Sequence, residues 1–550
     1  MTLRVALVVL LTALIAGCNR TETAPQPLTA QTGPLTTPST GGTLVRRLES
    51  DINTLNFILH TTEYENLVLS YLYAPLIDFD VNQKIIPRLA KSWEVSPDGR
   101  TYRFLLDEKA TFDDGAPVRA SDVLFTLGKI VDKNSGAFQL TSSFEGLQLD
   151  ASKAIDDRTV EIVFAMPRAS QLAAFNIAIL PESVYGKGDF KKDFNRKVVG
   201  NGPYRLTRRD AGKEILLERR NDYWGPRPSI EKIRFKIISD DTVAWNAMKR
   251  GEIDEMSISS DRWRNEGATE SVRNRMEIHR FHSGYIFVPW NNSDPLLRDA
   301  AIRRTLMMCL DRRAIIQNLY FGTARIMTGP FSPDQWTFNA DVRPIEFNLE
   351  EARKSFAALG WRDSNGDGVL DKGGKSFVID VLLHTGNKPS MDQAQIFQQA
   401  LKQVGVTMNL VTLDSATFFD RIQKGEYQSA FLAQGIDVDA DLDVSQFHSS
   451  QFPPNGNNWA FYSNPRVDKL ITEGRAEFDQ AKRLVIYREL HEILANDQPY
   501  GWTVEYTNKW GLNRRVGNVT VSNTGGLFFW YPGPLDWTLA ETASTLPPSP

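Results

Sequence analysis

The chain has 550 residues, a formal net charge of −4, and 41% hydrophobic residues. This length is sufficient for two or three domains with large cores. The small acidic balance over so long a chain argues against nucleic-acid binding, and we expect no nucleic-acid partner.

The first residues predict export from the cytoplasm. Arg4 precedes the apolar stretch 5–15, which has the length of a signal-peptide core and is too short to span a bilayer. The stretch ends in Ile15-Ala16-Gly17-Cys18, which resembles the bacterial lipobox, the site at which a cysteine is lipidated. We therefore expect a signal peptide at 1–17 and an extracytoplasmic protein, periplasmic or on the cell surface, anchored to the membrane through Cys18. An ordinary signal peptide with a chance cysteine is the alternative.

Residues 18–42 are rich in Thr, Pro and Gly and predict a flexible tether. The terminal segment 541–550 is expected to be disordered. With Cys18 lipidated, Cys309 is the one remaining cysteine, so no internal disulfide is expected. Cys309 shares the apolar face of a predicted helix at 300–319, which indicates a buried structural thiol.

The chain contains two different patterns of predicted secondary structure. Short alternating strands at 101–106 and 159–164, with an amphipathic helix at 121–131, predict an inserted α+β domain. Two other segments, 233–253 and 406–433, share one pattern: a β-rich run, an Asp-Thr or Asp-Ser helix cap, a short helix ending at glycine, and another extended run.

This shared pattern predicts strand–helix–strand units with parallel pairing, and therefore two α/β lobes built alike. Chance similarity is the alternative. A predicted strand at 377–383 and a helix at 391–404 extend the second lobe upstream.

Enzyme and metal signatures are incomplete. His491-Glu492 begins a zinc-protease motif, but Ala495 stands where the second histidine is required. The acidic segment 363–371 matches half of a calcium loop, but Gly374 occupies the position of the bidentate glutamate, so a turn is favoured. We expect no enzyme, no catalytic residue, no cofactor and no metal ligand.

An acidic run contains Asp437, Asp439, Asp441 and Asp443. In an extended chain all four carboxylates would point to one side, about 7 Å apart. The run follows a predicted strand, at the edge where open α/β sheets bind ligands. It is either a solvated acidic loop or a segment whose aspartates meet a positive ligand group.

Several motifs resemble the family 5 extracellular solute-binding proteins, the peptide- and nickel-binding proteins of ABC importers. The likeness covers about residues 43–540. It is carried, in order, by Pro87–Glu94 with Ser96–Phe104, Phe112–Pro117, Gly200–Tyr204, Arg220–Gly225, Arg298–Arg303 and Asn457–Pro465.

The resemblance implies an α/β, two-lobed periplasmic-binding-protein-like fold of type II, cluster C, with an extra inserted α+β domain. Lobe I would comprise 43–78, 199–284 and 505–540, the insertion 79–198, and lobe II 285–504. The protein would be a monomeric binding lipoprotein that closes about a hinge on a small solute, by default a peptide, and delivers it to an ABC-importer permease. A non-peptide solute such as a metal chelate or an opine, a ligand sensor, and a secreted hydrolase are the alternatives.

The resemblance also implies which residues bind the ligand. Asp437 would pair with the α-ammonium group of a peptide, with Asp439 and Asp441 as substitutes. Gln434 stands where tryptophan is common in the family, which weakens the match to the usual pocket. The expected walls of the cleft, each with packing as the alternative role, are Tyr285, Trp290, Asn291, Trp459 and Trp502.

Overall fold

The computed structural model describes residues 38–39, 41–60, 62–80, 84–192, 198–385, 387–436, 440–453, 456–521 and 535–540. The predicted signal peptide, Cys18 and the segment 541–550 lie outside these residues. No described helix combines the length and apolarity that a membrane span requires. Two residues of the predicted tether form β1 (Pro38–Ser39), which pairs with β23 (Thr538–Ala540).

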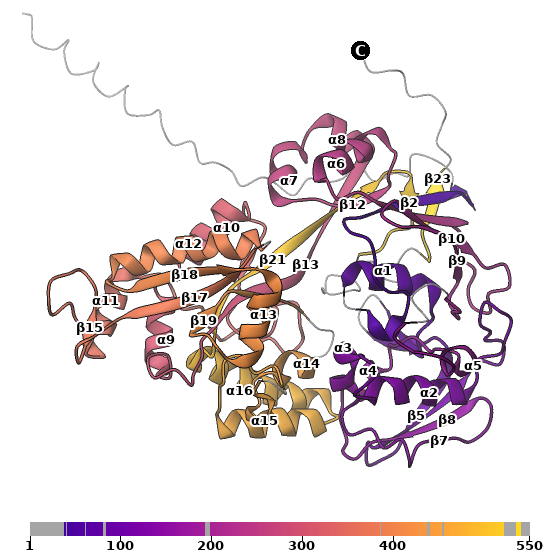
Figure 1. Cartoon of the computed structure of the whole chain (residues 1–550), viewed down its shortest axis with the longest axis horizontal. Helices are drawn as coiled ribbons and strands as arrows, with labels where there is room; N and C mark the ends of the chain where they lie inside the picture. Colours follow the sequence, from indigo (N-terminus) through magenta and orange to yellow (C-terminus); the bar gives the residue numbers. More distant parts are fainter. Residues whose placement is uncertain are drawn as a thin grey trace, which may run out of the picture.

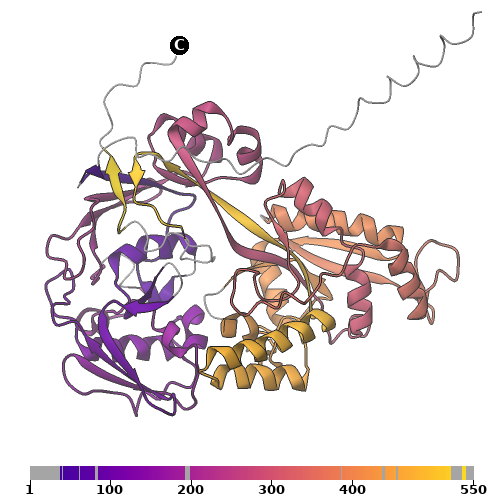
Figure 2. The same ribbon diagram turned by 180° about the vertical axis from the view of Figure 1, so that it is seen from behind.

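The fold is organised around a nine-stranded sheet that extends through both halves of the molecule (Figures 1 and 2). Two antiparallel strands of 14 residues, β13 and β21, run side by side from one half to the other. The strands of this sheet are β20 (Leu432–Gly435), β13 (Met276–Pro289), β21 (Tyr500–Asn513), β12 (Glu255–Ser257), β2 (Thr43–Leu48), β11 (Lys232–Ile237), β10 (Glu214–Arg219) and β9 (Tyr204–Asp210), with β14 (Arg325–Ile326) paired to β21.

Both predicted strand–helix–strand units are present, and they are built alike. In the first lobe, β11 and β12 flank β2 with parallel pairing, and α6 (Asp241–Arg250) connects them. In the second lobe, β18 (Thr407–Leu413) and β19 (Ser429–Ala430) flank β17 (Val378–His384) in the same way, and α13 (Ser415–Lys424) connects them. Each helix ends at a left-handed glycine, Gly251 or Gly425. The caps are Asp414, as predicted, and Asp240, one residue before the predicted position.

The inserted part is α+β, as predicted. Its antiparallel sheet has the order β5-β6-β8-β7, and α2 (Ala120–Val131) turns Val123, Leu127 and Ile130 into the core. The bounds of its other elements are β3 (Ile77–Phe79), β4 (Ile85–Pro87), β5 (Ala90–Val95), β6 (Thr101–Leu106), α3 (Phe138–Thr141), β7 (Lys153–Ala154), β8 (Thr159–Val163), α4 (Gln171–Ala174) and α5 (Glu182–Tyr185).

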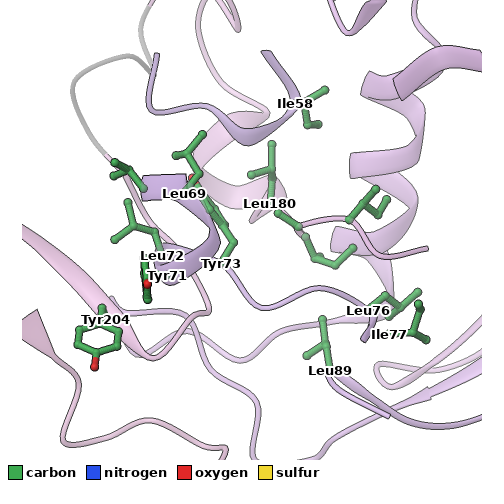
Figure 3. Packing of buried hydrophobic residues seen from close by; sticks show 14 of the residues in the cluster. Ile58, Leu69, Tyr71, Leu72, Tyr73, Leu76, Ile77, Leu89, Leu180 and Tyr204 are labelled. Carbon is green, nitrogen blue, oxygen red and sulfur yellow. The ribbon is translucent and has the colours of Figure 1, made fainter. Parts of the chain in front are cut away.

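One continuous hydrophobic core joins the inserted part to the first lobe. Leu89 and Leu180 of the inserted part belong to the same cluster as Leu69 and Leu72 of α1 (Glu63–Leu72) and Tyr204 of β9 (Figure 3). Because protein cores are close-packed, parts that share one core move as one body. The inserted part is therefore fixed to the first lobe.

The second lobe has cores of its own on the two faces of its sheet. The predicted helix at 300–319 is two helices, because Asp311 caps a new helix just after Cys309. Cys309 is fully buried, as predicted. The helices are α9 (Ala300–Met307), α10 (Arg312–Leu319), α11 (Leu349–Ala358), α12 (Lys388–Gln403), α14 (Ala440–Ser445), α15 (Pro465–Ala476) and α16 (Gln480–Asp497), and the first lobe adds α7 (Ser260–Glu266) and α8 (Glu270–Arg275).

The acidic segment 363–371 is a turn, as favoured. The Asp363 carboxylate accepts hydrogen bonds from the backbone of Gly366, Asp367 and Gly368, and the Asp371 carboxylate accepts from Ser364. Among the described residues, no group of three or more metal-ligating side chains is present.

Candidate ligand-binding site between the lobes

The two lobes are joined through β13 and β21, which makes this pair of strands the natural hinge (Figures 1 and 2). The pairing of β13 with β21 shifts register twice, between His282 and Gly284 and again between Tyr285 and Phe287. A bulge interrupts the ladder and bends a strand. The connection between the lobes is therefore irregular at its midpoint and regular on either side.

A row of polar residues crosses the sheet between these two bulges. Tyr285 lies opposite Gln434 of β20 and opposite Glu505 of β21, and Glu505 lies opposite Arg325 of β14. Directly paired residues of antiparallel strands point to the same face, so these four side chains share one face. We call them the polar row.

The neighbouring row, on the side of the second lobe, is apolar. Phe287 lies opposite Leu432 and opposite Trp502, and all three belong to the core of the second lobe. The two rows therefore differ in composition, although Tyr285 belongs to the same buried cluster as the apolar row and Glu505 is fully buried as well. The polar row is thus a largely buried polar layer at the edge of the second-lobe core, where β13 and β21 continue towards the first lobe.

Glu505 is the buried charge of the polar row. Its side chain is fully buried, and its carboxylate accepts hydrogen bonds from Arg325 Nε and, at 2.9 Å, from Ser332 Oγ. Arg325 also donates to Asp334 at 2.6 Å. Although burial lowers the pKa of Arg325, the hydrogen bonds to Glu505 and Asp334 raise it overall. Glu505 is therefore held by partners within the protein.

Three of the predicted cleft residues lie in these two rows. Tyr285 and Trp502 are buried, whereas Gln434 is half-buried. Trp502 Nε1 and Gln434 Oε1 are buried atoms without a hydrogen-bond partner among the described residues. Because buried polar atoms in proteins are nearly always paired, these two atoms are candidates for contact with a ligand.

Trp290 and Asn291 occupy structural positions. Trp290 is 1% exposed in the core on the other face of the sheet, where it packs edge-on against Phe397 of α12. Asn291 is buried, and its Nδ2 donates to the carbonyl of Tyr427 at 2.7 Å. The surroundings of both residues agree with packing, which was their alternative role. Contact with a ligand stays a prediction for both.

Trp459 is half-buried next to the apolar row. Its ring is stacked on that of Phe287, with ring centres 6.3 Å apart and an interplanar angle of 11°. Its carbonyl accepts a hydrogen bond from the Tyr427 hydroxyl. These contacts anchor Trp459 at the edge of the core, and a role in the wall of the cleft stays a prediction.

The acidic run is only partly described. Asp437 and Asp439 lie outside the described residues, directly after β20 and Ile436. Asp441 and Asp443 lie on α14, so this part of the run is helical and does not have the alternation of an extended chain.

Asp441 is fully buried between two arginines. Its carboxylate accepts from Arg168 Nε at 2.8 Å, from Arg475 Nε at 2.8 Å and from Ser170 Oγ at 2.9 Å. Although burial raises the pKa of Asp441, the two arginines lower it overall. Sequence reasoning did not single out Arg168, Ser170 or Arg475, since each lies at least 34 residues away and has no motif of its own.

The chain was compared with known protein families and with curated proteins, and both comparisons agree on one family. Residues 84–455 match the model of the bacterial extracellular solute-binding proteins, family 5. The oligopeptide-binding protein AppA of Bacillus subtilis is 26% identical over 471 residues, which cover 84% of this chain and 86% of AppA. The dipeptide-binding protein of Escherichia coli is 26% identical over 454 residues, covering 78% and 82% of the two chains.

The fold is also that of solved structures. The structure of Bacillus subtilis AppA in complex with a nonapeptide superposes with a TM-score of 0.77 at 24% identity, covering 92% of this chain and all of AppA. The two-lobed, type II periplasmic-binding-protein-like fold is thereby confirmed, whereas the exact domain boundaries stay predictions. The chain belongs to the family 5 bacterial extracellular solute-binding proteins.

Proposed function

We propose that this protein is the substrate-binding lipoprotein of an ABC importer, and that it captures a peptide between its lobes and delivers it unaltered to a permease. The observation that carries the proposal is the polar row at the bulged strand crossing, next to which β20 leads into the acidic segment 436–441. The names of the relatives, oligopeptide-binding and dipeptide-binding proteins, support a peptide as the solute.

Capture would proceed by closure about β13 and β21. A ligand that touches both lobes only in the closed form binds that form more tightly and shifts the population towards it. The two register shifts, one with its extra residue in β13 and one with its extra residue in β21, supply the irregular segment that such a motion needs. No catalytic step is required, since the ligand's binding free energy drives the closure.

Asp437 is our first choice for the residue that binds the peptide's ammonium group, and Asp439 is the substitute. A carboxylate enclosed by closing lobes would be costly unless a positive group and hydrogen-bond donors offset its desolvation. A free peptide amine supplies that positive group. Gln434, Tyr285 and Trp502 would line the same end of the site, with Gln434 Oε1 and Trp502 Nε1 available for polar contacts.

The lipid anchor at Cys18 and the tether that follows it would keep the protein at the membrane as a monomer. Acyl chains contribute about 0.8 kcal/mol per buried CH₂, so two or more chains anchor a protein durably. Tethering near the permease raises the effective concentration for docking. Metabolic labelling with a fatty-acid analogue, compared between the wild type and Cys18→Ser, tests the anchor directly.

Native mass spectrometry of protein purified without denaturation tests the solute. We expect an adduct that yields intact peptides after gentle release, and no turnover of peptides added in excess. Cleaved peptides would support the hydrolase instead. Adducts of metal chelates or opines would support the non-peptide alternatives.

A further inference from the structure

The two halves of the molecule meet a second time, away from the crossing strands. The inserted part approaches α14 and α15 of the second lobe in both views (Figures 1 and 2). Here Arg168 Nε and Ser170 Oγ of the inserted part donate to the same oxygen, Asp441 Oδ2, at 2.8 and 2.9 Å. Arg475 of α15 donates to the other oxygen, Asp441 Oδ1, at 2.8 Å.

Backbone and apolar contacts flank this ion pair. The amide of Ala169 donates to the carbonyl of Arg475 at 2.7 Å, which joins the two halves through the main chain. The ring of Phe478 lies over the turn at Gly99, so closely that a Cβ atom on Gly99 would be 2.5 Å from it. Gly99 also has a φ of +68°, so glycine suits this turn in two independent ways.

The partners of Asp441 divide between the two halves. Arg168 and Ser170 belong to the inserted part, which shares its core with the first lobe, whereas Arg475 belongs to the second lobe together with Asp441. Separation of the lobes would therefore break the bonds to Arg168 and Ser170 and leave the Asp441–Arg475 pair intact. The contact to Arg168 and Ser170 thus requires the inserted part and the second lobe to be together, and its loss does not leave the carboxylate without a partner.

We infer that Arg168 and Ser170, with Asp441 and Arg475, form a latch that fastens the closed lobes and positions the segment that follows β20. Asp441 lies four residues after Asp437, so the latch fixes one end of the segment that carries the proposed ammonium-binding residue. Arg168 is accordingly a positioning residue that does not touch the ligand. The inference rests on the proposed capture by closure and adds a second fastening point opposite the hinge.

Pulsed electron–electron spectroscopy on the full chain measures the latch directly. Spin labels at Lys153→Cys on β7 and Lys469→Cys on α15 occupy exposed positions on either side of the contact, whereas Cys309 is buried. The test variants are Arg168→Ala and Arg168→Lys, and Arg158→Ala is the control, since Arg158 is an exposed arginine of the same inserted part. Each protein is measured alone and with an equimolar pool of free-amine peptides of two to nine residues.

We expect a short label-to-label distance in the wild type that Arg168→Ala depletes, Arg168→Lys partly restores and Arg158→Ala leaves unchanged. Dissociation of bound peptide should accelerate about tenfold in Arg168→Ala, less than for a buried charge that loses its sole partner, because Asp441 keeps Arg475. Should Arg168→Ala fail to fold by circular dichroism, Phe478→Ala tests the same interface and should shift the distances in the same direction.

Unchanged distances in Arg168→Ala, or a wild type without the short distance in either condition, would overturn the latch. Lost peptide binding with unchanged distances would also overturn it, because Arg168 would then act on the ligand. A wild type that binds none of the peptides while Arg168→Ala still separates the lobes would refute the peptide proposal and leave the latch standing.

Discussion

Glu505 and Arg325 lie opposite each other on β21 and β14, and their ion pair occupies the sheet where the strands cross between the lobes. Glu505 is completely buried, while the Arg325 side chain is 27% exposed. The pair therefore joins the end of the second-lobe core to the hinge. Loss of this ion pair should lower the stability of the second lobe more than it lowers the affinity for the ligand.

Replacing Glu505 by Gln should lower the free energy of unfolding by about 1–3 kcal/mol, because a hydrogen bond to a charged group is lost and Arg325 loses one partner. The partial exposure of Arg325 and its second partner, Asp334, keep the cost below that of a fully buried pair. Urea unfolding measures the change, with Glu94→Gln at an exposed position as the control. Equal stabilities of the two variants would contradict this role for Glu505.

His491 should make the protein less stable in mild acid. The buried ring accepts a hydrogen bond at Nδ1 from the Asn339 amide, and burial lowers its pKa to about 4. In the unfolded chain the histidine titrates near 6.5, so the unfolded state binds more protons between pH 6.5 and 4, and stability falls as the pH falls through this range.

The expected loss from His491 alone is about 2 kcal/mol between pH 7 and pH 5. Urea unfolding at both pH values measures it, and His491→Gln should show a smaller difference than the wild type. His384→Gln, at a partly exposed histidine, should keep the wild-type difference. Identical pH dependence in all three proteins would show that His491 is not buried as a neutral ring.

The two cap glycines should differ in their sensitivity to alanine. Gly251 has a φ of 75°, and a Cβ atom there would meet only Asn513 Nδ2 at 3.8 Å, an ordinary contact, so Gly251→Ala should cost about 1 kcal/mol of backbone strain. At Gly425, with a φ of 70°, a Cβ atom would also lie 2.5 Å from the Phe461 ring, so Gly425→Ala should cost more. Thermal or urea unfolding of the two variants measures the difference, and a larger loss for Gly251→Ala would contradict the packing at Gly425.

Asp437→Asn should weaken the binding of a free-amine peptide by about 2–5 kcal/mol, the cost of breaking a buried charge pair. The N-acetylated form of the same peptide lacks the ammonium group, so its weaker binding should not change in this variant. Calorimetry with both peptides separates an ammonium contact from general damage to the site. Asp439→Asn tests the substitute, and an unchanged affinity in both variants would exclude both residues from the ammonium site.

Helix caps and other short-range sequence signals predicted those helices and strands whose ends are set by neighbouring residues in the chain. Asp414 and Gly425 cap the two ends of α13, so the second strand–helix–strand unit was predictable from the sequence. The helix at 300–319 was predicted as one piece because its apolar periodicity continues past the break. In the structure Asp311 is the N-cap of α10. From the periodicity alone, Asp311 was expected to lie on the polar face of one longer helix.

The site was harder to predict because its contacts are distant in sequence. A tryptophan beside asparagines, such as Trp290, has the same local sequence whether it packs in a core or lines a cleft. Arg168 lies 273 residues before Asp441, and nothing in the local pattern of either residue indicates the other. Burial of Asp441 against an arginine from another part of the chain is visible only in the folded structure.

Small-angle X-ray scattering of the protein, stripped of solute and then saturated with a free-amine peptide that it binds, tests capture by closure most directly. We predict a smaller radius of gyration and a shorter maximum dimension in the bound state, because the lobes approach each other about β13 and β21. Identical scattering curves with and without tightly bound peptide would contradict the account.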